Sequence, residues 1–291
     1  MGPVDFIKGK TPVYGLIGDP VEHSFSPVLQ NTIAQSLGVP FVYVPFHVEK
    51  GNLSDAVKGA FSLGISGLNV TVPYKTEIIP YLCGVDKKAF SIGAVNTLKR
   101  TKEGYVGYNT DILGLSMCFS LRGIKIKDKT VVILGAGGAA KAAAVMAAES
   151  GAGNIVIVNR TIEKAEELID HIAKTYLVRG KAIGYQELHN IQGRKLLIQT
   201  TSVGMGEGVS KSPFEDIAFL RDVEAVVDII YTPWRTKLLQ DAEKMGCQTV
   251  NGLDMLLYQG MASFEIWHDI TIENAKKLQL RNALTQYYRE L

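Results

Sequence analysis

The chain has 291 residues, of which 46% are hydrophobic and 21% charged, a composition that favours a globular protein with a sizeable core and excludes a disordered chain. Its 31 basic and 29 acidic residues are spread along the sequence without a basic block, so a nucleic-acid partner is not expected. The longest apolar run, residues 139–148, is too short to cross a bilayer, and the N-terminus lacks a signal pattern.

Three widely separated cysteines, Cys83, Cys118 and Cys247, form no CxxC pattern. They are typical of free thiols in a reducing compartment, and no metal site is expected. We therefore expect a cytoplasmic protein with no membrane partner. Its expected partner is a small molecule, and its expected state is a monomer or a homodimer.

In the first part of the chain, short apolar runs alternate with helix-like segments, which is typical of βαβ units around a mostly parallel sheet. The expected order is a strand at residues 13–17, a helix at 27–37, a strand at 41–48, a helix at 53–63 and a strand at 67–72. The segment KRTKEGY predicts a turn between two further strands, and residues 112–121 predict a helix.

A basic, polar stretch, RGIKIKDK, then suggests a domain join, after which TVVILG is typical of a strand buried on both faces. Further strands are expected at residues 155–158, 196–200, 225–230 and 249–250, and terminal helices at 255–267 and 272–288. The sequence thus predicts an α/β protein of two domains, residues 1–112 and 113–252, with C-terminal helices, residues 253–291, that return to the first domain.

The segment VVILGAGGAAKAA places Gly135, Gly137 and Ala140 at the GxGxxG/A spacing between a strand and a helix. The first glycine permits a tight turn, the second lets the backbone approach a pyrophosphate, and the small third residue lets helix and strand pack closely. Free N–H groups at the helix start suit the phosphate charge. A glycine-rich turn without a ligand is the alternative, but this setting favours a Rossmann-like dinucleotide site.

The end of the next strand bears on the choice of cofactor. Proteins that bind NAD normally place Asp or Glu there for the ribose 2′-hydroxyl, whereas this chain has Asn159, Arg160 and Thr161, with Lys164 one turn later. A guanidinium can form paired hydrogen bonds with a 2′-phosphate. A solvated arginine is the alternative, but the preceding glycine loop favours NADP.

Polar side chains gather in four segments of the first domain: HSFSP with Ser24 and Ser26, NVTVPYK with Asn69, Thr71 and Lys75, GAVNT with Asn96, and GYNTDILG with Asn109, Thr110 and Asp111. Ser26 before a proline is typical of a helix N-cap, whereas Ser24 has no evident structural role. Helix capping by Asp111 and a solvated surface position for Lys75 are the structural alternatives.

These hydroxyls and carboxamides suit a polyhydroxylated ligand, which Asn69 and Thr71 would approach from one strand face. Hydride transfer between a nicotinamide and a carbon bearing a hydroxyl requires a proton to move on or off oxygen. A lysine with an aspartate can move that proton, so Lys75 and Asp111 are the candidate catalytic pair.

In their order along the chain, eight motifs resemble those of the shikimate dehydrogenase family: HSFSP, NVTVPYK, GAVNT, YNTD, GAGGAAKA, NRT, TTSVGM and GLDMLLYQG. The resemblance covers nearly the whole sequence. It implies reversible NADPH-dependent reduction of 3-dehydroshikimate to shikimate, on the route to chorismate and the aromatic amino acids.

The resemblance also implies site residues. Lys75 and Asp111 would be the catalytic pair. The substrate would be surrounded by Ser24, Ser26, Thr71, Lys75, Asn96, Asp111, Tyr231 and Gln259. The cofactor would be bound by Gly135, Ala136, Gly137, Gly138 and Ala139 at the pyrophosphate, by Asn159, Arg160, Thr161 and Lys164 at the 2′-phosphate, and by Ile229, Gly252 and Met255 near the nicotinamide.

Two positions depart from the family pattern. Gln199 stands where an asparagine often opens the NATSxGM motif, and Tyr74 stands where phenylalanine or histidine is common. Two alternatives stay open: a quinate/shikimate dehydrogenase that uses NAD or NADP, and a catalytically silent dinucleotide-sensing relative.

Overall fold

The computed structural model describes residues 7–290, which divide into two units. The first unit contains the described residues up to Leu113 together with those from Leu256 onward, and the second unit runs from Gly114 to Met255. The first unit is therefore built from two separate parts of the chain, with the second unit inserted between them.

The described part of the first unit contains a mixed six-stranded sheet in the order β2-β1-β3-β5-β6-β4. Its strands are β1 (Val13–Gly18), β2 (Val42–His47), β3 (Gly67–Val70), β4 (Gly84–Val85), β5 (Thr97–Arg100) and β6 (Tyr105–Tyr108). The β1 strand pairs in parallel with β2 and β3, whereas β5 is antiparallel to both of its neighbours. Parallel pairing of β1 with β3 brings the carboxyl ends of these strands to one edge of the sheet.

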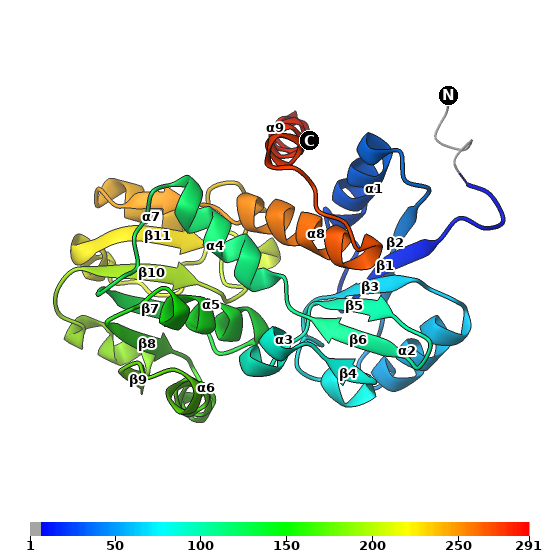
Figure 1. The fold of residues 1–291 in the computed structure, drawn as a ribbon. Helices are drawn as coiled ribbons and strands as arrows, with labels where there is room; N and C mark the ends of the chain where they lie inside the picture. Colours follow the sequence, from blue (N-terminus) through cyan, green and yellow to red (C-terminus); the bar gives the residue numbers. More distant parts are fainter. Residues whose placement is uncertain (1–6, 291) are drawn as a thin grey trace. The chain divides into compact units, whose positions relative to one another are not determined.

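Within the described residues, four helices pack on this sheet: α1 (Ser26–Leu37), α2 (Leu53–Ser62), α3 (Lys87–Ile92) and α8 (Leu253–His268). The last helix of this unit, α9 (Asn274–Glu290), places Tyr288 against Phe25, and α4 (Asp111–Leu121) leads into the second unit. In Figure 1, α8 runs beside α1, and the two helices are joined by a hydrogen bond from Gln30 Nε2 to Gly260 O of 3.0 Å. The indole of Trp267, also on α8, donates to Leu98 O on β5. The expected return of the C-terminal helices to the first domain is confirmed.

The second unit contains a parallel six-stranded sheet within the described residues, in the order β12-β11-β10-β7-β8-β9. Its strands are β7 (Thr130–Leu134), β8 (Asn154–Val158), β9 (Gly180–Ile183), β10 (Lys195–Gln199), β11 (Val223–Asp228) and β12 (Gln248–Val250). Counted from β7, this is the Rossmann order 3-2-1-4-5-6, with its switch point between β7 and β10.

Helices α5 (Gly138–Glu149), α6 (Ile162–Thr175) and α7 (Lys237–Lys244) connect these strands. Residues 131–134 of β7 and 155–158 of β8 are fully buried, as expected for a parallel sheet covered on both faces. The α/β fold class predicted from the sequence is confirmed. In the part of the chain that the structure covers, no helix combines the length and apolar character that a bilayer crossing requires.

Candidate functional site

Lys75 lies in the turn that follows β3. The main chain of this turn is fixed on both sides, because Tyr74 Oη donates to Val48 O at 2.7 Å and Val95 N donates to Lys75 O at 2.7 Å. Tyr74 is buried against the core of the first unit, so its aromatic ring and its hydroxyl both anchor the turn. The lysine is thus carried on a well-supported backbone.

The ammonium group of Lys75 lies 2.6 Å from Asp111 Oδ2, and the two side chains are only 15% and 4% exposed. Asp111 is the first residue of α4, and its own N–H donates to Asn109 Oδ1 at 3.0 Å. The carboxylate of Asp111 therefore pairs with the lysine, and the carboxamide of Asn109 satisfies the start of the helix. Neither structural alternative, a cap at Asp111 or a solvated Lys75, describes what these side chains do.

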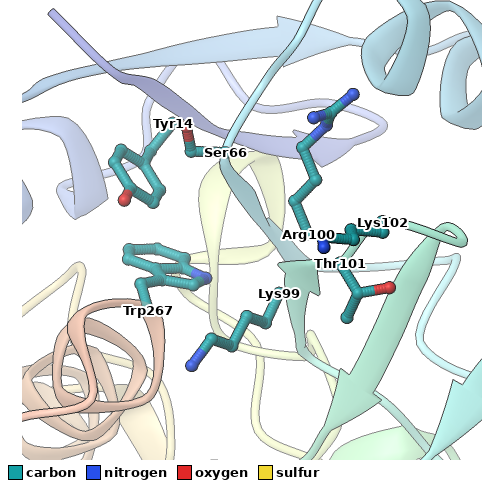
Figure 2. Close-up of a pocket in the computed structure, with 7 residues that line it drawn as sticks. All are labelled: Tyr14, Ser66, Lys99, Arg100, Thr101, Lys102 and Trp267. Atoms are coloured by element: carbon teal, nitrogen blue, oxygen red, sulfur yellow. The ribbon is translucent and has the colours of Figure 1, made fainter.

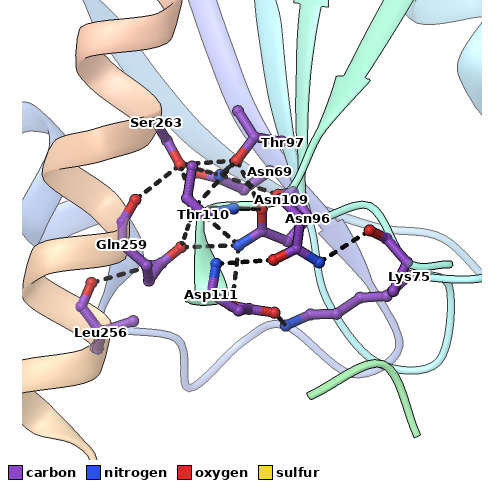
Figure 3. Close-up of polar contacts among 11 residues, drawn as sticks. Asn69, Lys75, Asn96, Thr97, Asn109, Thr110, Asp111, Leu256, Gln259 and Ser263 are labelled. Carbon is purple, nitrogen blue, oxygen red and sulfur yellow. Dashed lines mark hydrogen bonds and ion pairs between the residues drawn. The ribbon is translucent and has the colours of Figure 1, made fainter. Parts of the chain in front are cut away.

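Asn96 fixes the second oxygen of this carboxylate. Its Nδ2 donates to Asp111 Oδ1 and to Thr110 Oγ1, both at 2.9 Å, and its Oδ1 accepts from Thr110 N at 2.8 Å. Asn96, the residue before β5, also places its Nδ2 3.2 Å from Gln259 Oε1 on α8, so that its carboxamide contacts both α8 and α4 (Figure 3). Both oxygens of Asp111 are held, which sets the direction of the carboxylate toward Lys75.

A layer of buried hydroxyls lies behind Asn96. Ser263, on the same face of α8 as Gln259, places its Oγ 2.8 Å from Thr97 Oγ1 and 3.1 Å from Thr110 Oγ1 (Figure 3). Asn69 is 6% exposed, and its Nδ2 donates to Ser263 Oγ at 3.0 Å while its Oδ1 accepts from Tyr43 Oη at 2.8 Å. Asn69 thus joins the same network as Asn96, and its approach to a ligand stays a prediction.

The predicted serines and Thr71 belong to the loops at the same edge of the first sheet. Thr71 follows β3, and its N–H donates to Ile17 O at the end of β1. Ser24 Oγ accepts from Ser26 N at 3.2 Å, so Ser24 has a local structural role that the sequence did not reveal. Ser26 opens α1 with its side chain buried and makes no capping bond, although the expected Pro27 does occupy the first turn.

Lys75, Asn96, Asp111 and Gln259 are therefore brought together by direct hydrogen bonds in the first unit. Tyr231 belongs to the second unit, where it is partly buried after β11. The sequence did not single out Thr97 or Ser263. Ser263 lies four residues after Gln259, a spacing that places both on one helix face and is the signal that would have found it.

The glycine loop of the second unit has the geometry that a dinucleotide phosphate needs. Gly135 has φ +105°, a conformation that favours glycine, and an added Cβ would lie 2.8 Å from Thr200 Oγ1. At Gly137, which precedes the first residue of α5, an added Cβ would meet nothing within 4 Å, so open space faces the helix start. Gly138 and Ala139 form the first turn of α5, and their N–H groups can receive a phosphate beside Ala136.

The segment after β8 lies next to this loop, because Gly135 N donates to Val158 O at 2.8 Å. Asn159 Nδ2 donates to Thr161 O, which closes the turn before α6. Arg160 and Lys164 are exposed, and no acidic residue occupies this turn. The residues present fit a cofactor that carries a 2′-phosphate.

The ends of β11 and β12 meet at Gly252. Its N–H donates to Ile230 O at 3.0 Å, and an added Cβ would lie 1.9 Å from Ile229 O, so only glycine fits. Met255, in the first turn of α8, is buried. Ile229 and Gly252 thus follow neighbouring strand ends of the second unit, the edge at which ligands bind in open α/β sheets, and Met255 follows in α8.

A separate pocket of about 420 Å³ lies near the start of β1 and of β3, the opposite sheet edge from Lys75. Its lining includes Tyr14, Trp267, Lys99 and Arg100 (Figure 2). Lys99 is paired with Asp269, and Arg100 donates to Phe61 O with its guanidinium 4.3 Å from the Phe61 ring. These cations are engaged within the protein. Within residues 7–290, no group of histidine, cysteine and carboxylate side chains forms a metal cluster.

A Rossmann strand order, an open glycine loop and a largely buried Lys–Asp pair define a dinucleotide-dependent α/β enzyme. Three family models match the chain: the shikimate dehydrogenase substrate-binding domain at residues 16–98, shikimate/quinate 5-dehydrogenase at 119–230, and the shikimate 5′-dehydrogenase C-terminal domain at 252–273. The chain belongs to the shikimate dehydrogenase family.

Individual relatives agree. The NADP⁺ shikimate dehydrogenase of Methanocaldococcus jannaschii is 44% identical over 90% of this chain and 93% of its own length. A solved shikimate dehydrogenase in complex with NADP⁺ has a TM-score of 0.86 and 41% identity, covering 97% of both chains. The enzyme of Listeria monocytogenes, solved with shikimate and NAD, has a TM-score of 0.83 and 32% identity, covering 96% of this chain and 98% of its own.

Proposed function

We propose that this protein catalyses the reversible NADPH-dependent reduction of 3-dehydroshikimate to shikimate, with Lys75 as the group that moves the proton. The observation that carries the proposal is the Lys75–Asp111 pair at 2.6 Å, held by Asn96 within a chain of the shikimate dehydrogenase family. The exposed arginine after β8 and the absence of an acid there support NADP as the cofactor.

When bound, NADPH supplies the hydride that reduces the ketone carbon. Lys75 donates a proton to the carbonyl oxygen during reduction and accepts the hydroxyl proton in the reverse direction. Asp111 keeps the ammonium group of Lys75 in place, and Asn96 keeps the carboxylate from rotating. The hydrogen bonds that join these three groups support this division of work.

The remaining assignments are part of the same proposal. Residues 1–112 bind the substrate, residues 113–252 bind NADP, and residues 253–291 complete the substrate domain. The substrate contacts are Ser24, Ser26, Thr71, Lys75, Asn96, Asp111, Tyr231 and Gln259. The cofactor contacts are Gly135, Ala136, Gly137, Gly138, Ala139, Asn159, Arg160, Thr161, Lys164, Ile229, Gly252 and Met255. Three free cysteines support a cytoplasmic setting.

The decisive experiment is a spectrophotometric assay of NADP⁺ reduction with shikimate, carried out on the wild type, Lys75→Ala and Lys58→Ala. Loss of the proton-transfer group should lower kcat of Lys75→Ala by about 10²- to 10⁴-fold, with a much smaller change in the KM for shikimate. Lys58, exposed on α2, is the matched control and should change neither constant. Unchanged turnover in Lys75→Ala would remove this lysine from the mechanism.

A second candidate is a quinate/shikimate dehydrogenase that accepts NAD, because the Listeria relative was solved with shikimate and NAD. Initial rates with shikimate and quinate, each with NADP⁺ and NAD⁺, separate the two candidates. A higher kcat/KM with quinate or with NAD⁺ would favour the second candidate, and no turnover with any combination would favour a silent dinucleotide-binding relative.

A further inference from the structure

Asp228 is a fully buried acid that the proposed reaction does not use. It is the last residue of β11, and it directly precedes the segment of residues 229–236 that leads to α7. Buried acids are costly unless they are hydrogen-bonded, so the contacts of this carboxyl group indicate what it stabilises.

The carboxyl group of Asp228 joins both ends of this segment. Its Oδ1 accepts from Ile230 N at 3.0 Å, and its Oδ2 lies 2.7 Å from Thr236 Oγ1. Thr236 is fully buried and is the N-cap of α7, where its Oγ1 accepts from Leu239 N. The side chain of Asp228 thus holds both ends of residues 229–236 at the end of β11.

The same segment forms the surface proposed to lie beside the nicotinamide. Ile230, held through its N–H by Asp228, accepts from Gly252 N through its carbonyl oxygen. Gly252 packs directly on Ile229 O, and Asn251 Nδ2 donates to Trp234 O at 3.2 Å. A shift of residues 229–231 would therefore move the turn at Gly252 with it.

Burial raises the pKa of Asp228 to about 7, while its hydrogen bonds from Ile230 and Thr236 oppose that change. A protonated carboxyl group can still accept from Ile230 N through one oxygen and donate to Thr236 Oγ1 through the other. An asparagine side chain has the same arrangement of acceptor and donor, so Asp228→Asn is the conservative variant of this contact.

We propose that Asp228 is a positioning residue that fixes residues 229–231 and the adjoining turn at Gly252 against the nicotinamide half of the cofactor. This inference rests on the proposed NADP-dependent reaction. Asp228 touches neither the substrate nor the cofactor. It acts through Ile230 and Thr236, and its removal should disturb the nicotinamide half of the site and spare the adenosine half.

The test compares four variants: Asp228→Ala, Asp228→Asn, Thr236→Val and Asp216→Ala. Asp216 is the matched control, because its Oδ1 also accepts from the backbone two residues on, Ala218 N at 2.9 Å, but in an exposed turn that carries no proposed site residue. Three quantities are measured: kcat with NADP⁺ and shikimate, the fluorescence of bound NADPH, and the Kd of adenosine 2′,5′-bisphosphate.

In Asp228→Ala and Thr236→Val, kcat should fall by about ten-fold or more, and bound NADPH should fluoresce more like the free cofactor. The Kd of adenosine 2′,5′-bisphosphate should stay within about two-fold of the wild type in every variant, which also shows that the second unit is folded. Asp228→Asn should restore most of the kcat and the wild-type fluorescence, and Asp216→Ala should change none of the three quantities.

Wild-type fluorescence and kcat in Asp228→Ala would overturn the inference, as would equal losses of nicotinamide and adenosine binding. If Asp228→Ala does not fold, Thr236→Val and Asp228→Asn decide by the same criteria. The fluorescence of bound NADPH and the Kd of adenosine 2′,5′-bisphosphate can both be measured on a protein that does not turn over shikimate. A chain inactive on shikimate would therefore contradict the proposed function and leave the role of Asp228 to these two measurements.

Discussion

At the scale of single residues, the orientation of the Lys75–Asp111 pair depends on the hydrogen bonds of both carboxylate oxygens. Asp111 presents one carboxylate oxygen to Lys75 and the other to Asn96. The carboxylate cannot turn away from the lysine without breaking a bond to a buried carboxamide, and such a bond to a charged group is worth about 1.5–3 kcal/mol. The pair is thereby oriented before any ligand arrives.

The pH dependence of stability provides a prediction for Asp228. Its pKa of about 7 in the folded protein lies above the ordinary aspartate value of 3.8. Between these two values the folded state keeps a proton that the unfolded state releases. The stabilisation of the folded state by this protonated carboxyl group therefore declines as the pH rises from about 4 to about 7. Three pH units correspond to on the order of 4 kcal/mol.

The asparagine side chain of Asp228→Asn cannot ionise, so the variant should not show this decline in stability with rising pH. The free energy of unfolding of the variant, relative to that of the wild type, should therefore increase between pH 4 and pH 7 and then level off. Urea unfolding at several pH values measures the difference. A difference that is flat, or that decreases with pH, would contradict a raised pKa at this carboxyl group.

Sequence motifs were sufficient to select Lys75, Asn96, Asp111 and Gln259, which the structure joins by hydrogen bonds. The same motifs predicted a ligand-facing Asn69, but they did not indicate its partners within the protein. Its burial depends on Tyr43 and on Ser263, which is 194 residues away in the sequence. The residues next to Asn69 in the sequence do not indicate partners so far along the chain. The contacts among the buried hydroxyls of Thr97, Thr110 and Ser263 could therefore be identified only from the structure.

At the scale of elements, the close approach of α1 and α8 depends on Gly260. A Cβ added there would lie 2.4 Å from Leu29 Cδ2 and 3.3 Å from Gln30 Nε2. Gly260→Ala should therefore lower the free energy of unfolding by about 1–3 kcal/mol, because both neighbours are fully buried and must move. Denaturant unfolding of the intact chain measures this change.

Gly59 on α2 provides the control, since an added Cβ there meets nothing within 4 Å. Gly59→Ala should raise the free energy of unfolding by about 0.5–1 kcal/mol through helix propensity. A stabilising effect of similar size in Gly260→Ala would show that the helices are not in close contact at this position.

Most long elements follow from apolar periodicity in the sequence, including the fully buried β7 and β8. The elements that were not predicted are short or exposed: β4 has two residues, α3 has six, and three of the four residues of β9 are not buried. Such segments have no apolar repeat to detect. The neighbouring strands β6 and β8 supply the hydrogen bonds of β4 and β9, and Asp86 caps the start of α3.

At the scale of the whole molecule, a preference for NADP⁺ over NAD⁺ should be measurable as a difference in the stability of the folded protein. A ligand that binds only the folded state adds about 2.7 kcal/mol to the free energy of unfolding at 100 times its Kd. NADP⁺ should therefore raise the unfolding midpoint of the wild type more than NAD⁺ does at equal concentration. Arg160→Ala should remove most of that difference, and Arg179→Ala, which changes another exposed arginine of the second unit, should keep it.

Equal midpoints with the two nucleotides in the wild type would contradict the assignment of Arg160 to a 2′-phosphate. Thermal unfolding over a series of nucleotide concentrations distinguishes a weak site from an absent one, because the midpoint shift grows with concentration.

The inserted arrangement of the first unit also has a consequence for synthesis on the ribosome. Residues up to Leu113 emerge first, but Gln259, Ser263 and Trp267 emerge only after the whole second unit. At typical translation speeds this delay is on the order of 10–30 s. Until α8 arrives, the aromatic residues Tyr14 and Phe41 lack Trp267 as a partner. The hydrogen bonds that Gln259 and Ser263 make with the network around Asp111 therefore form only after the second unit has been synthesised.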